Sequence, residues 1–365
     1  MVDVPVAAPT RLAEEERRAV SGAISRVVMD GPWILGPSVE RFEDDFAAFL
    51  DINHVVGVGN GTDALAIALS ALDLPPGSGV LVAANEGGYA STALRLCGLE
   101  PVVMDVDELT MAPTAATAAA AIRADVSAIV VTHLHGEAID IRELDAWRSK
   151  QGLRLIEDCA QAHGARLSGS HVGRSGDAAT FSFYPTKNLG AIGDAGAVAF
   201  HDVQLATRAR AIREYGWGER FRVDFVGGRN SRLDPIHAAV LSARLPFLDD
   251  RNTRRRRIAA RYEAVLAGGP TRLHGDTMTT VSHHAVVVSS TRDALKAHLA
   301  RCGISTAIHY PFLVSEMPGL RIPRGVRSPV AATLRDSILT VPSFPEMSEE
   351  EIERVTASLE EWAHA

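Results

Sequence analysis

Hydrophobic and polar positions alternate with two different periods along the first 200 residues of the chain. Short aliphatic runs of the kind that form buried strands occur at 55–58, 79–82, 102–104, 128–131 and 153–156. Stretches with helical spacing of apolar residues separate them, at 63–72, 89–97, 115–124 and 142–150. Repeated strand–helix units predict an α/β fold with a mainly parallel sheet covered by helices on both faces. Ligands of such sheets bind at the carboxyl ends of the strands, in the loops that lead into helices.

The pattern changes after about residue 240. Helical stretches follow at 241–266, at 291–302 and from 348 onward. One apolar strand lies between the first two, at 285–288. The last helix begins with a capping serine, Ser348, and three acids in its first turn. We therefore predict a large domain over residues 1–240 and a smaller C-terminal α/β domain over residues 241–365.

Composition and charge narrow the classes of protein that fit this pattern. Hydrophobic residues make up 46% of the 365 residues and charged residues 22%, which suits a sizeable buried core and argues against disorder. The net charge of −8 argues against a general nucleic-acid binder, since such proteins carry broad basic surfaces. This net charge is still compatible with one local cationic pocket that binds an anionic substrate.

Cysteine usage and the start of the chain bear on location. Cys97, Cys159 and Cys302 lie far apart without C-x-x-C spacing, which predicts reduced thiols that pack as small hydrophobes. The N-terminus lacks a signal-like pattern, and no apolar run reaches the length of about 18 residues that a membrane span needs. We expect a cytoplasmic protein that contacts no membrane.

A glycine-rich turn lies between the first predicted strand and helix, at Gly57-Val58-Gly59-Asn60-Gly61-Thr62-Asp63. Small residues let the backbone approach an anion, and a helix N-terminus presents free N–H groups and a positive dipole end. The turn therefore indicates a phosphate site, although glycine-rich turns also join strands to helices without binding an anion.

The apolar strand at 153–156 runs into two carboxylates, Glu157 and Asp158, and Asp158 is expected at the carboxyl edge of the sheet. A buried carboxylate is costly there unless it is paired. A protonated pyridine nitrogen would be a suitable partner, because the ion pair keeps such a ring electron-withdrawing. A helix cap or a metal ligand is the alternative.

A lysine, Lys187, lies inside the aromatic and glycine-rich stretch 181–190. Burial and nearby cations would lower its pKa from about 10.4 and make a nucleophilic amine available near neutral pH. Most lysines are solvated surface charges, so the context and not the residue type singles it out. The polar loop at 227–235 would by itself suit a turn followed by a helix cap. Tyr89 would offer an aromatic face to a flat ring, with an ordinary core tyrosine as the alternative.

Taken together, these segments resemble the DegT/DnrJ/StrS family of sugar aminotransferases from about Gly31 to Pro345. Members of this family are fold type I pyridoxal-5′-phosphate (PLP) enzymes of the aspartate aminotransferase superfamily, with a sheet of the seven-stranded type. The matching segments are Trp33-Ile34-Leu35-Gly36-Pro37, Phe42-Glu43, Asn60-Gly61-Thr62-Asp63-Ala64-Leu65, Ile156-Glu157-Asp158-Cys159-Ala160-Gln161, Phe181 to Gly190, Tyr215-Gly216-Trp217 and Asn230-Ser231-Arg232-Leu233-Asp234.

The resemblance implies a role for each matching site residue. Lys187 would carry the cofactor as a Schiff base and shuttle a proton, while Asp158 would pair with the pyridinium nitrogen. The other implied cofactor contacts are Gln161 on the phenolic oxygen, Tyr89 on the ring face, and Gly61, Thr62 and Ser182 on the phosphate. Asn230 would reach the phosphate of the neighbouring subunit's cofactor, which implies a homodimer with active sites shared across the interface.

The implied reaction moves the amino group of glutamate onto a keto-sugar linked to a nucleotide, in amino-sugar biosynthesis. The segment 61–65 resembles aminotransferases acting on 3-keto sugars, which favours a dTDP-3-keto-6-deoxyhexose. Related sugar dehydratases have histidine in place of the Schiff-base lysine, so Lys187 argues against that branch. A cyclitol (keto-inositol) aminotransferase or other family relative remains the alternative within the family, and a non-catalytic PLP-binding regulator is the alternative of another class.

The chain departs from the family pattern near the expected substrate region. His135 stands where members often have tyrosine, His237 where they commonly have glutamine, and a histidine often found beyond Pro311 is missing. The departures therefore concern the substrate more than the cofactor. The candidate sugar contacts are His163, Tyr184, His309 and Tyr310, and for His163 a buried, hydrogen-bonded histidine is the alternative.

We expect no metal site. His133 and His135 would share one face of an extended strand, but no further Cys/His cluster with zinc spacing accompanies them. The arginine run 254–257 spans every face of one helical turn, which favours a solvated or subunit-facing surface over a diphosphate site.

Overall fold

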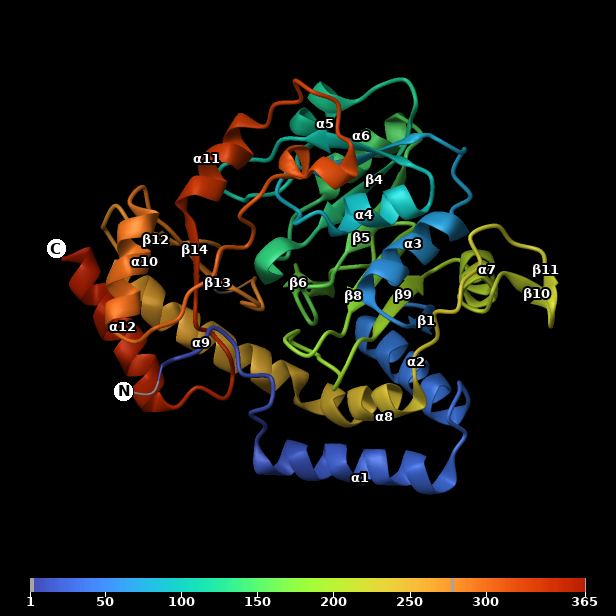
Figure 1. Cartoon of the computed structure of the whole chain (residues 1–365), viewed down its shortest axis with the longest axis horizontal. Helices are drawn as coiled ribbons and strands as arrows, with labels where there is room; N and C mark the ends of the chain where they lie inside the picture. Colours follow the sequence, from blue (N-terminus) through green and yellow to red (C-terminus); the bar gives the residue numbers. More distant parts are fainter. Residues whose placement is uncertain (1–2, 277–278, 365) are drawn as a thin grey trace.

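The computed structural model describes residues 3–276 and 279–364, and its centre is a seven-stranded sheet in the order β1-β9-β8-β5-β4-β2-β3 (Figure 1). The strands are β1 (His54–Val58), β2 (Gly79–Ala83), β3 (Glu100–Met104), β4 (Val126–Thr132), β5 (Arg154–Asp158), β8 (Ala178–Ser182) and β9 (Gly196–Phe200). Strands β3, β2, β4, β5 and β8 pair in parallel, whereas β9 is antiparallel to both β8 and β1. The predicted α/β fold with a mainly parallel sheet is confirmed.

The five aliphatic runs predicted as strands all lie in this sheet, as β1 to β5. Their side chains are buried on both faces, which explains why they read as continuous apolar runs instead of alternating ones. Strands β8 and β9 were not predicted as strands. Their alanines and glycine carry little strand propensity, and only burial between the helix layers makes them strands.

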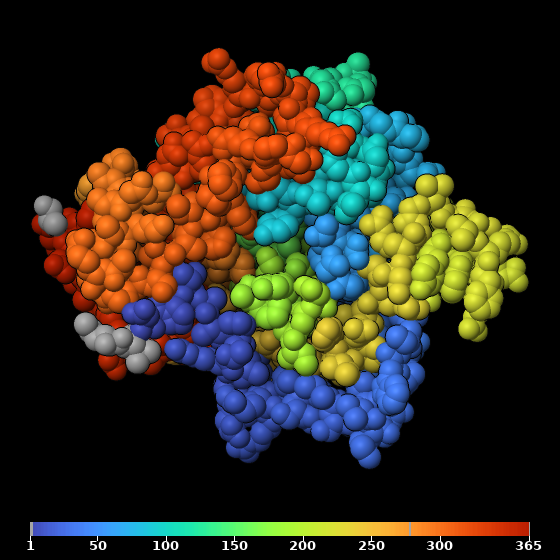
Figure 2. All heavy atoms as spheres, in the orientation of Figure 1, coloured from blue at the N-terminus to red at the C-terminus, as the bar shows by residue number. Residues whose placement is uncertain are grey.

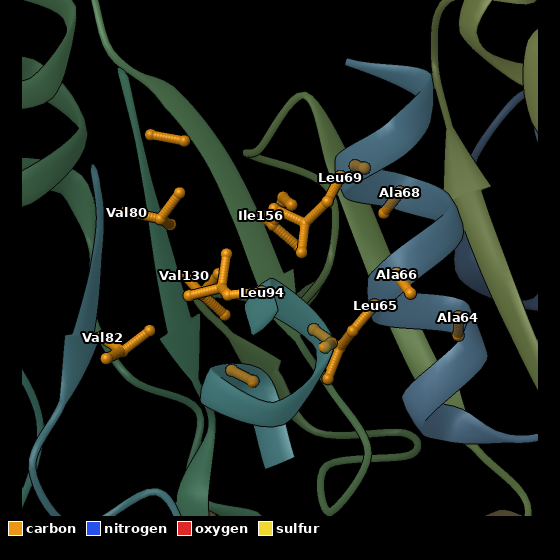
Figure 3. Close-up of a cluster of buried hydrophobic side chains, with 14 of the residues drawn as sticks. Ala64, Leu65, Ala66, Ala68, Leu69, Val80, Val82, Leu94, Val130 and Ile156 are labelled. Carbon is orange, nitrogen blue, oxygen red and sulfur yellow. The ribbon is translucent and has the colours of Figure 1, made fainter. Parts of the chain in front are cut away.

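Helices cover both faces of the sheet, as predicted. One face packs against α3 (Gly61–Ala71), α4 (Tyr89–Leu96) and α7 (Val203–Arg213). The other face packs against α2 (Pro37–Leu50), α5 (Ala115–Ala121), α6 (Arg142–Lys150) and α8 (Pro235–Arg244). In Figure 3 Leu65 and Leu69 of α3 and Leu94 of α4 point towards Val130 and Ile156 of the sheet. Burial of each such leucine contributes roughly 1.5–3 kcal/mol, so this layer holds the N-terminus of α3 firmly against the sheet edge.

A second, three-stranded antiparallel sheet lies in the C-terminal part, in the order β12-β13-β14. Its elements are β12 (Arg272–Leu273), β13 (Ala285–Val288), β14 (Ile338–Val341), α9 (Leu248–Leu266), α10 (Arg292–Arg301), α11 (Pro329–Ser337) and α12 (Glu349–Ala363). Ser348 and Glu351 form the capping box expected at the start of α12. The N-terminal segment joins this part of the molecule, because Val4 pairs with Ile304 and packs in the same core. The predicted boundary at residue 240 falls inside α8, and the division into two domains stays a prediction.

The prediction of a single helix over 241–266 is wrong. Helix α8 ends at Arg244, a short 3-10 turn at Leu245–Phe247 follows, and α9 begins at Leu248. Pro246 lies in that turn, where it lacks the N–H that a continuing α-helix would use and its ring clashes with the preceding turn. The arginine run lies in α9, where Arg254 and Arg257 are exposed, as a solvated or subunit-facing surface requires. Arg255 differs, because it is buried and its guanidinium donates to the Ser343 carbonyl.

Two peripheral elements complete the fold. Helix α1 (Glu14–Asp30) packs along α8, as Figure 1 shows. The hairpin of β10 (Trp217–Glu219) and β11 (Arg222–Val223) projects from the body of the molecule, in yellow in Figure 2, and a second small hairpin pairs β6 (Arg166–Leu167) with β7 (Ser170–His171). Within the described ranges, none of the helices has both the length and the apolar character that a membrane crossing requires.

Candidate active site

A cavity of about 470 Å³ opens at the carboxyl ends of β4, β5 and β8, where the fold predicts a ligand site. It is lined by most of the residues singled out from the sequence, namely Gly61, Thr62, Tyr89, Asp158, Gln161, Ser182, Tyr184, Lys187, His309 and Tyr310. The C-terminal part closes one side of the cavity through His309 and Tyr310. The structure thus gathers residues that are up to 249 positions apart into one site, counting from Gly61 to Tyr310.

Asp158 is the last residue of β5 and is buried at the floor of the cavity. One carboxylate oxygen accepts a hydrogen bond from the Ala160 N–H at 3.1 Å, and the other lies 3.5 Å from the hydroxyl of Thr132, its neighbour in register on β4. Burial raises the pKa of Asp158, although the Ala160 N–H and the charge of Lys187 oppose that shift. A carboxylate that is desolvated to this degree needs a positive partner inside the cavity.

Lys187 lies in the turn that follows β8, and its side chain is partly buried and lines the same cavity. The Lys187 N–H donates to the Tyr184 carbonyl at 2.8 Å, and the next residue, Asn188, donates to Asn252 of α9 and to the Val281 carbonyl. These bonds anchor the turn on both sides of the lysine. Burial lowers the pKa of Lys187 to about 8, and the charge of Asp158 only partly offsets this. The side chain is therefore an amine that loses its proton close to neutral pH.

Cofactor uptake by the apoprotein is expected to accelerate as the pH rises through about 8, because the neutral form of Lys187 is the nucleophile. Stopped-flow absorbance after mixing apoprotein with PLP measures this rate across the pH range. The matched reference is the reaction of PLP with a free lysine derivative, whose amine has its ordinary pKa of about 10.4. A midpoint as high as that of the free derivative would contradict the buried position of the amine.

The start of α3 forms a cradle for an anion. Asn60 caps the helix by accepting a hydrogen bond from the Asp63 N–H at 2.8 Å, which leaves the N–H groups of Gly61 and Thr62 at the cavity wall. Ser182, the last residue of β8, faces them. A β-carbon on Gly61 would lie 2.6 Å from the Ser182 β-carbon, so glycine is required for this close approach.

Replacing Gly61 with alanine is expected to weaken PLP binding at least about tenfold, because the added methyl group must push Ser182 away from the α3 N-terminus at an overpacking cost of about 1–3 kcal/mol. Fluorescence titration of the apoprotein with PLP measures the affinity.

Gly22→Ala on α1 is the matched control, since a β-carbon there meets only the end of the Arg26 side chain at 3.5 Å. It should keep the affinity of the original chain. Equal PLP affinity of the Gly61→Ala and Gly22→Ala variants would count against the cradle.

Gln161, Tyr310 and Tyr89 form a connected wall. The Gln161 side chain accepts a hydrogen bond from the His135 N–H at 2.7 Å and donates to the Tyr310 hydroxyl at 2.8 Å. The Tyr310 ring meets the Tyr89 ring edge-on, with centroids 5.8 Å apart, and packs against Gly87, where a β-carbon would lie 2.7 Å from it. Tyr89 is half exposed at the cavity mouth. Gln161 keeps one amide hydrogen for a ligand, and Tyr89 presents a ring to it.

Two predicted site residues do not line this cavity. His163 is fully buried and packs against the rings of Phe181 and Phe183 behind the site, where burial lowers its pKa to about 3. Asn230 is exposed, and its neighbour Ser231 binds the Gly59 N–H and the Asp63 carboxylate beside the α3 N-terminus. Asn230 thus lies close to the cradle of its own chain, but it is not among the residues that line the cavity.

The expectation that His133 and His135 share one face of a strand is wrong. Strand β4 ends at Thr132, and His135 has a left-handed backbone with φ of 61° in the following turn. The His133 ring accepts a hydrogen bond from the Ile139 N–H at Nδ1, so its Nε2 carries the hydrogen and donates to Glu157 at 3.0 Å. His135 instead packs against His274 and His284, with ring centroids 5.9 and 6.0 Å away.

Sequence reasoning missed two histidines that line the cavity, His283 and His284. His283 bonds to Asn188, beside Lys187, and His284 stacks on His309 with centroids 3.9 Å apart. Burial holds the pKa of both imidazoles well below the ordinary value, so they face the cavity as neutral donors and acceptors. The available signal was a pair of histidines directly before the apolar run at 285–288.

A buried carboxylate, Glu86, was missed as well. It accepts hydrogen bonds from the N–H groups of Ala90 and Ser91 at 2.8 and 3.0 Å and from the Ser91 hydroxyl, which fixes the first turn of α4. Burial raises its pKa to about 6 despite these bonds. It therefore holds the helix that carries Tyr89 at the cavity.

The residues present fit PLP. The α3 cradle offers free N–H groups and a hydroxyl for a phosphate, Asp158 offers a desolvated carboxylate for a protonated ring nitrogen, and Lys187 offers an amine with a lowered pKa for an aldehyde. Tyr89 and Gln161 complete the set with a ring and an amide hydrogen. All five kinds of contact face one cavity.

Comparison with known proteins gives the same assignment. The model of the DegT/DnrJ/EryC1/StrS aminotransferase family matches residues 14–360. The dTDP-3-amino-3,4,6-trideoxy-alpha-D-glucose transaminase of Streptomyces venezuelae is 38% identical, over 96% of this chain and 93% of that protein. The UDP-N-acetyl-3-dehydro-alpha-D-glucosamine 3-aminotransferase of Acidithiobacillus ferrooxidans is 36% identical over 95% of each.

A solved structure has the same fold over its whole length. The crystal structure of S. venezuelae DesV in complex with a ketimine intermediate has a TM-score of 0.95 to this chain, with 37% identity and complete coverage of both chains. From this match, the family match and the fit of the site, the chain belongs to the DegT/DnrJ/EryC1/StrS aminotransferase family, as a fold type I enzyme that depends on PLP.

Proposed function

We propose that this enzyme transfers the amino group of glutamate to the C3 carbonyl of a nucleotide-linked keto-sugar, a dTDP-3-keto-6-deoxyhexose. The observation that carries the proposal is the partly buried amine of Lys187, whose pKa is lowered, in one cavity with the buried carboxylate of Asp158. The position of the amino group is supported by the two relatives described above, whose names both place nitrogen at C3 of a nucleotide-linked sugar.

Each cavity residue has a task in this reaction. The bound cofactor supplies an electron-withdrawing ring that stabilises negative charge on the reacting carbon. Asp158 keeps the ring nitrogen protonated, and Tyr89 and Gln161 orient the ring. The Nζ atom of Lys187 would take a proton from the donor carbon and return it to the cofactor carbon on the other side of the transferred nitrogen, because an amine with a pKa near 8 exchanges protons readily at neutral pH.

The sugar is proposed to lie between Tyr184, His309 and Tyr310 at the outer wall of the cavity. Burial lowers the pKa of His309 to about 4, and its Nδ1 bonds to the Thr340 hydroxyl. Neutral histidines and tyrosine hydroxyls suit sugar hydroxyl groups, which both donate and accept hydrogen bonds. His163 is proposed only as a packing residue behind this site.

The homodimer is part of the proposal. Among the described residues that line the cavity, none is an arginine, yet a nucleotide sugar and glutamate both bring negative charge. The hairpin β10–β11, which projects in Figure 2, and the loop after it carry the exposed apolar residues Phe221 and Val226, which a second chain would cover. Asn230 follows this segment and is exposed. We propose that this segment brings Asn230 to the cofactor phosphate of the partner subunit, in a cytoplasmic homodimer.

The test is a substrate panel. Purified enzyme loaded with PLP is mixed with glutamate alone, then with dTDP- and UDP-linked 3-keto and 4-keto sugars and with a keto-inositol. Glutamate should convert the yellow form of the cofactor, and a dTDP-3-keto-6-deoxyhexose should restore it most efficiently. Restoration by the keto-inositol alone would replace the proposal with the cyclitol aminotransferase. A bound cofactor that glutamate leaves unchanged would support a regulator.

A further inference from the structure

Three potential metal ligands meet between the helices α10 and α12, away from the active-site cavity. His298 and Cys302 lie one turn apart on the same face of α10, and Glu361 lies in the last turn of α12. One ligand atom from each residue lies within 4.8 Å of the other two. An imidazole, a thiol and a carboxylate are a donor set that zinc and similar divalent ions bind. None of the three lines the catalytic cavity.

The orientation of the His298 ring leaves a nitrogen available. Its Nε2 lies 2.9 Å from the Ser358 carbonyl oxygen of α12. A carbonyl oxygen can only accept, so Nε2 carries the hydrogen and donates it, and Nδ1 keeps a lone pair. Histidines that ligate metals are held in the same way, with the second ring nitrogen donating to a carbonyl or carboxylate.

A second cluster also contains a histidine, a cysteine and a glutamate, but its histidine and glutamate already have hydrogen-bond partners within the protein. His133, Glu157 and Cys159 also lie within ligand distance of one another. The Ile139 N–H donates to His133, while Glu157 accepts from His133, Gly173, Ser175 and Gly176. The lone pairs of that histidine and carboxylate are therefore used within the protein, and the cluster is a hydrogen-bonded support for β5.

The electrostatics of the α10–α12 group favour a cation. Cys302 caps the C-terminus of α10, and Glu361 lies in the last turn of α12, which contains no basic residue. The C-terminal end of a helix carries a partial negative charge, so a carboxylate there is unfavourable and a cation is stabilising by about 0.3–1 kcal/mol at the surface. The last turn of α10 already contains Arg301, so a divalent ion between the two helix ends would neutralise mainly the α12 end and Glu361.

We propose that His298 Nδ1, Cys302 Sγ and a Glu361 carboxylate oxygen form a binding site for a divalent ion of the zinc type, with water as the fourth ligand. On binding, the Cys302 thiol loses its proton to solvent and a sulfur–metal bond forms, with no change in oxidation state. The ion links α10 to α12 and stabilises the C-terminal part of the molecule. Because the three residues lie outside the catalytic cavity, the role is structural.

The test titrates Zn²⁺ against the PLP-loaded enzyme in competition with a chromophoric chelator. The original chain should bind Zn²⁺, and Cys302→Ser and His298→Ala should each weaken this binding at least about tenfold, as expected when one of three protein ligands is lost. Cys97→Ser is the matched control, because the Cys97 thiol is also partly buried and already donates to the Ala66 carbonyl. It should bind Zn²⁺ like the original chain.

Two further readouts separate the site from adventitious binding. Zn²⁺ should raise the unfolding temperature of the original chain and of Cys97→Ser, but not of Cys302→Ser. The affinity should also fall as the pH is lowered, since protons compete for the thiolate and the imidazole. Equal Zn²⁺ affinity of the original chain and Cys302→Ser, or no binding by the original chain, overturns the proposal. Neither outcome depends on whether the enzyme aminates a sugar.

Discussion

Replacing Lys187 with alanine is expected to abolish transamination, with a loss of at least about 10³-fold in turnover with glutamate and any keto-sugar. The reason is that one amine performs two tasks. It would bond to the aldehyde of the cofactor with loss of water, and after the amino donor has displaced it, its Nζ would carry the proton between two carbons. Burial holds the pKa of this amine at about 8, and among the described residues that line the cavity Lys187 is the only lysine. Turnover is measured by 2-oxoglutarate formation from glutamate.

Borohydride reduction of the loaded enzyme provides the direct control. The chain has three lysines, Lys150, Lys187 and Lys296, and both Lys150 and Lys296 are exposed. Peptide mass analysis after reduction should find the cofactor mass on the Lys187 peptide alone. Lys150→Ala should keep turnover and the adduct, whereas Lys187→Ala should lose both. Turnover of the Lys187→Ala variant at the original rate would end the assignment of the active site.

Replacing Asp158 with asparagine is expected to lower turnover by about 10²-fold or more, because a neutral amide cannot hold the proton on the ring nitrogen of the cofactor. The same change should make the apoprotein more stable at neutral pH. Burial raises the folded-state pKa of Asp158, so the folded state favours the protonated carboxyl, and this group makes the apoprotein less stable as the pH rises above the ordinary pKa of 3.8. The Asp158→Asn apoprotein should lack this loss.

Two measurements check this pair of effects. Steady-state turnover gives the first, and thermal unfolding of the apoprotein between about pH 4 and 7 gives the second. Asp44→Asn, at an exposed position on α2, should change neither of them. If the Asp158→Asn variant loses activity and apoprotein stability together, the carboxylate stabilises the fold and does not act on the ring nitrogen of the cofactor.

The sequence by itself determined the layered fold and, through its resemblance to the family, the chemistry of the cofactor. Apolar runs that end at a turn or a charged residue specify buried strands and their carboxyl ends, so the places of Gly61 and Asp158 follow from local pattern and from the rule that ligands lie at that edge. Lys187 stands out because an amine in an aromatic, glycine-rich stretch is rare. These properties are local, and each can be read within a dozen residues.

Only the tertiary structure decided which distant residues complete the cavity. His283, His284 and Tyr310 come from the C-terminal part and meet Lys187 and Gln161 through packing between segments about 100 or more positions apart, which no periodicity encodes. Packing also placed His163 behind the phenylalanine rings, and the turn after β4 separated His135 from His133. Whether a side chain faces a cavity depends on the backbone direction at its own position and on every element packed around it, so these contacts could not be read from the chain.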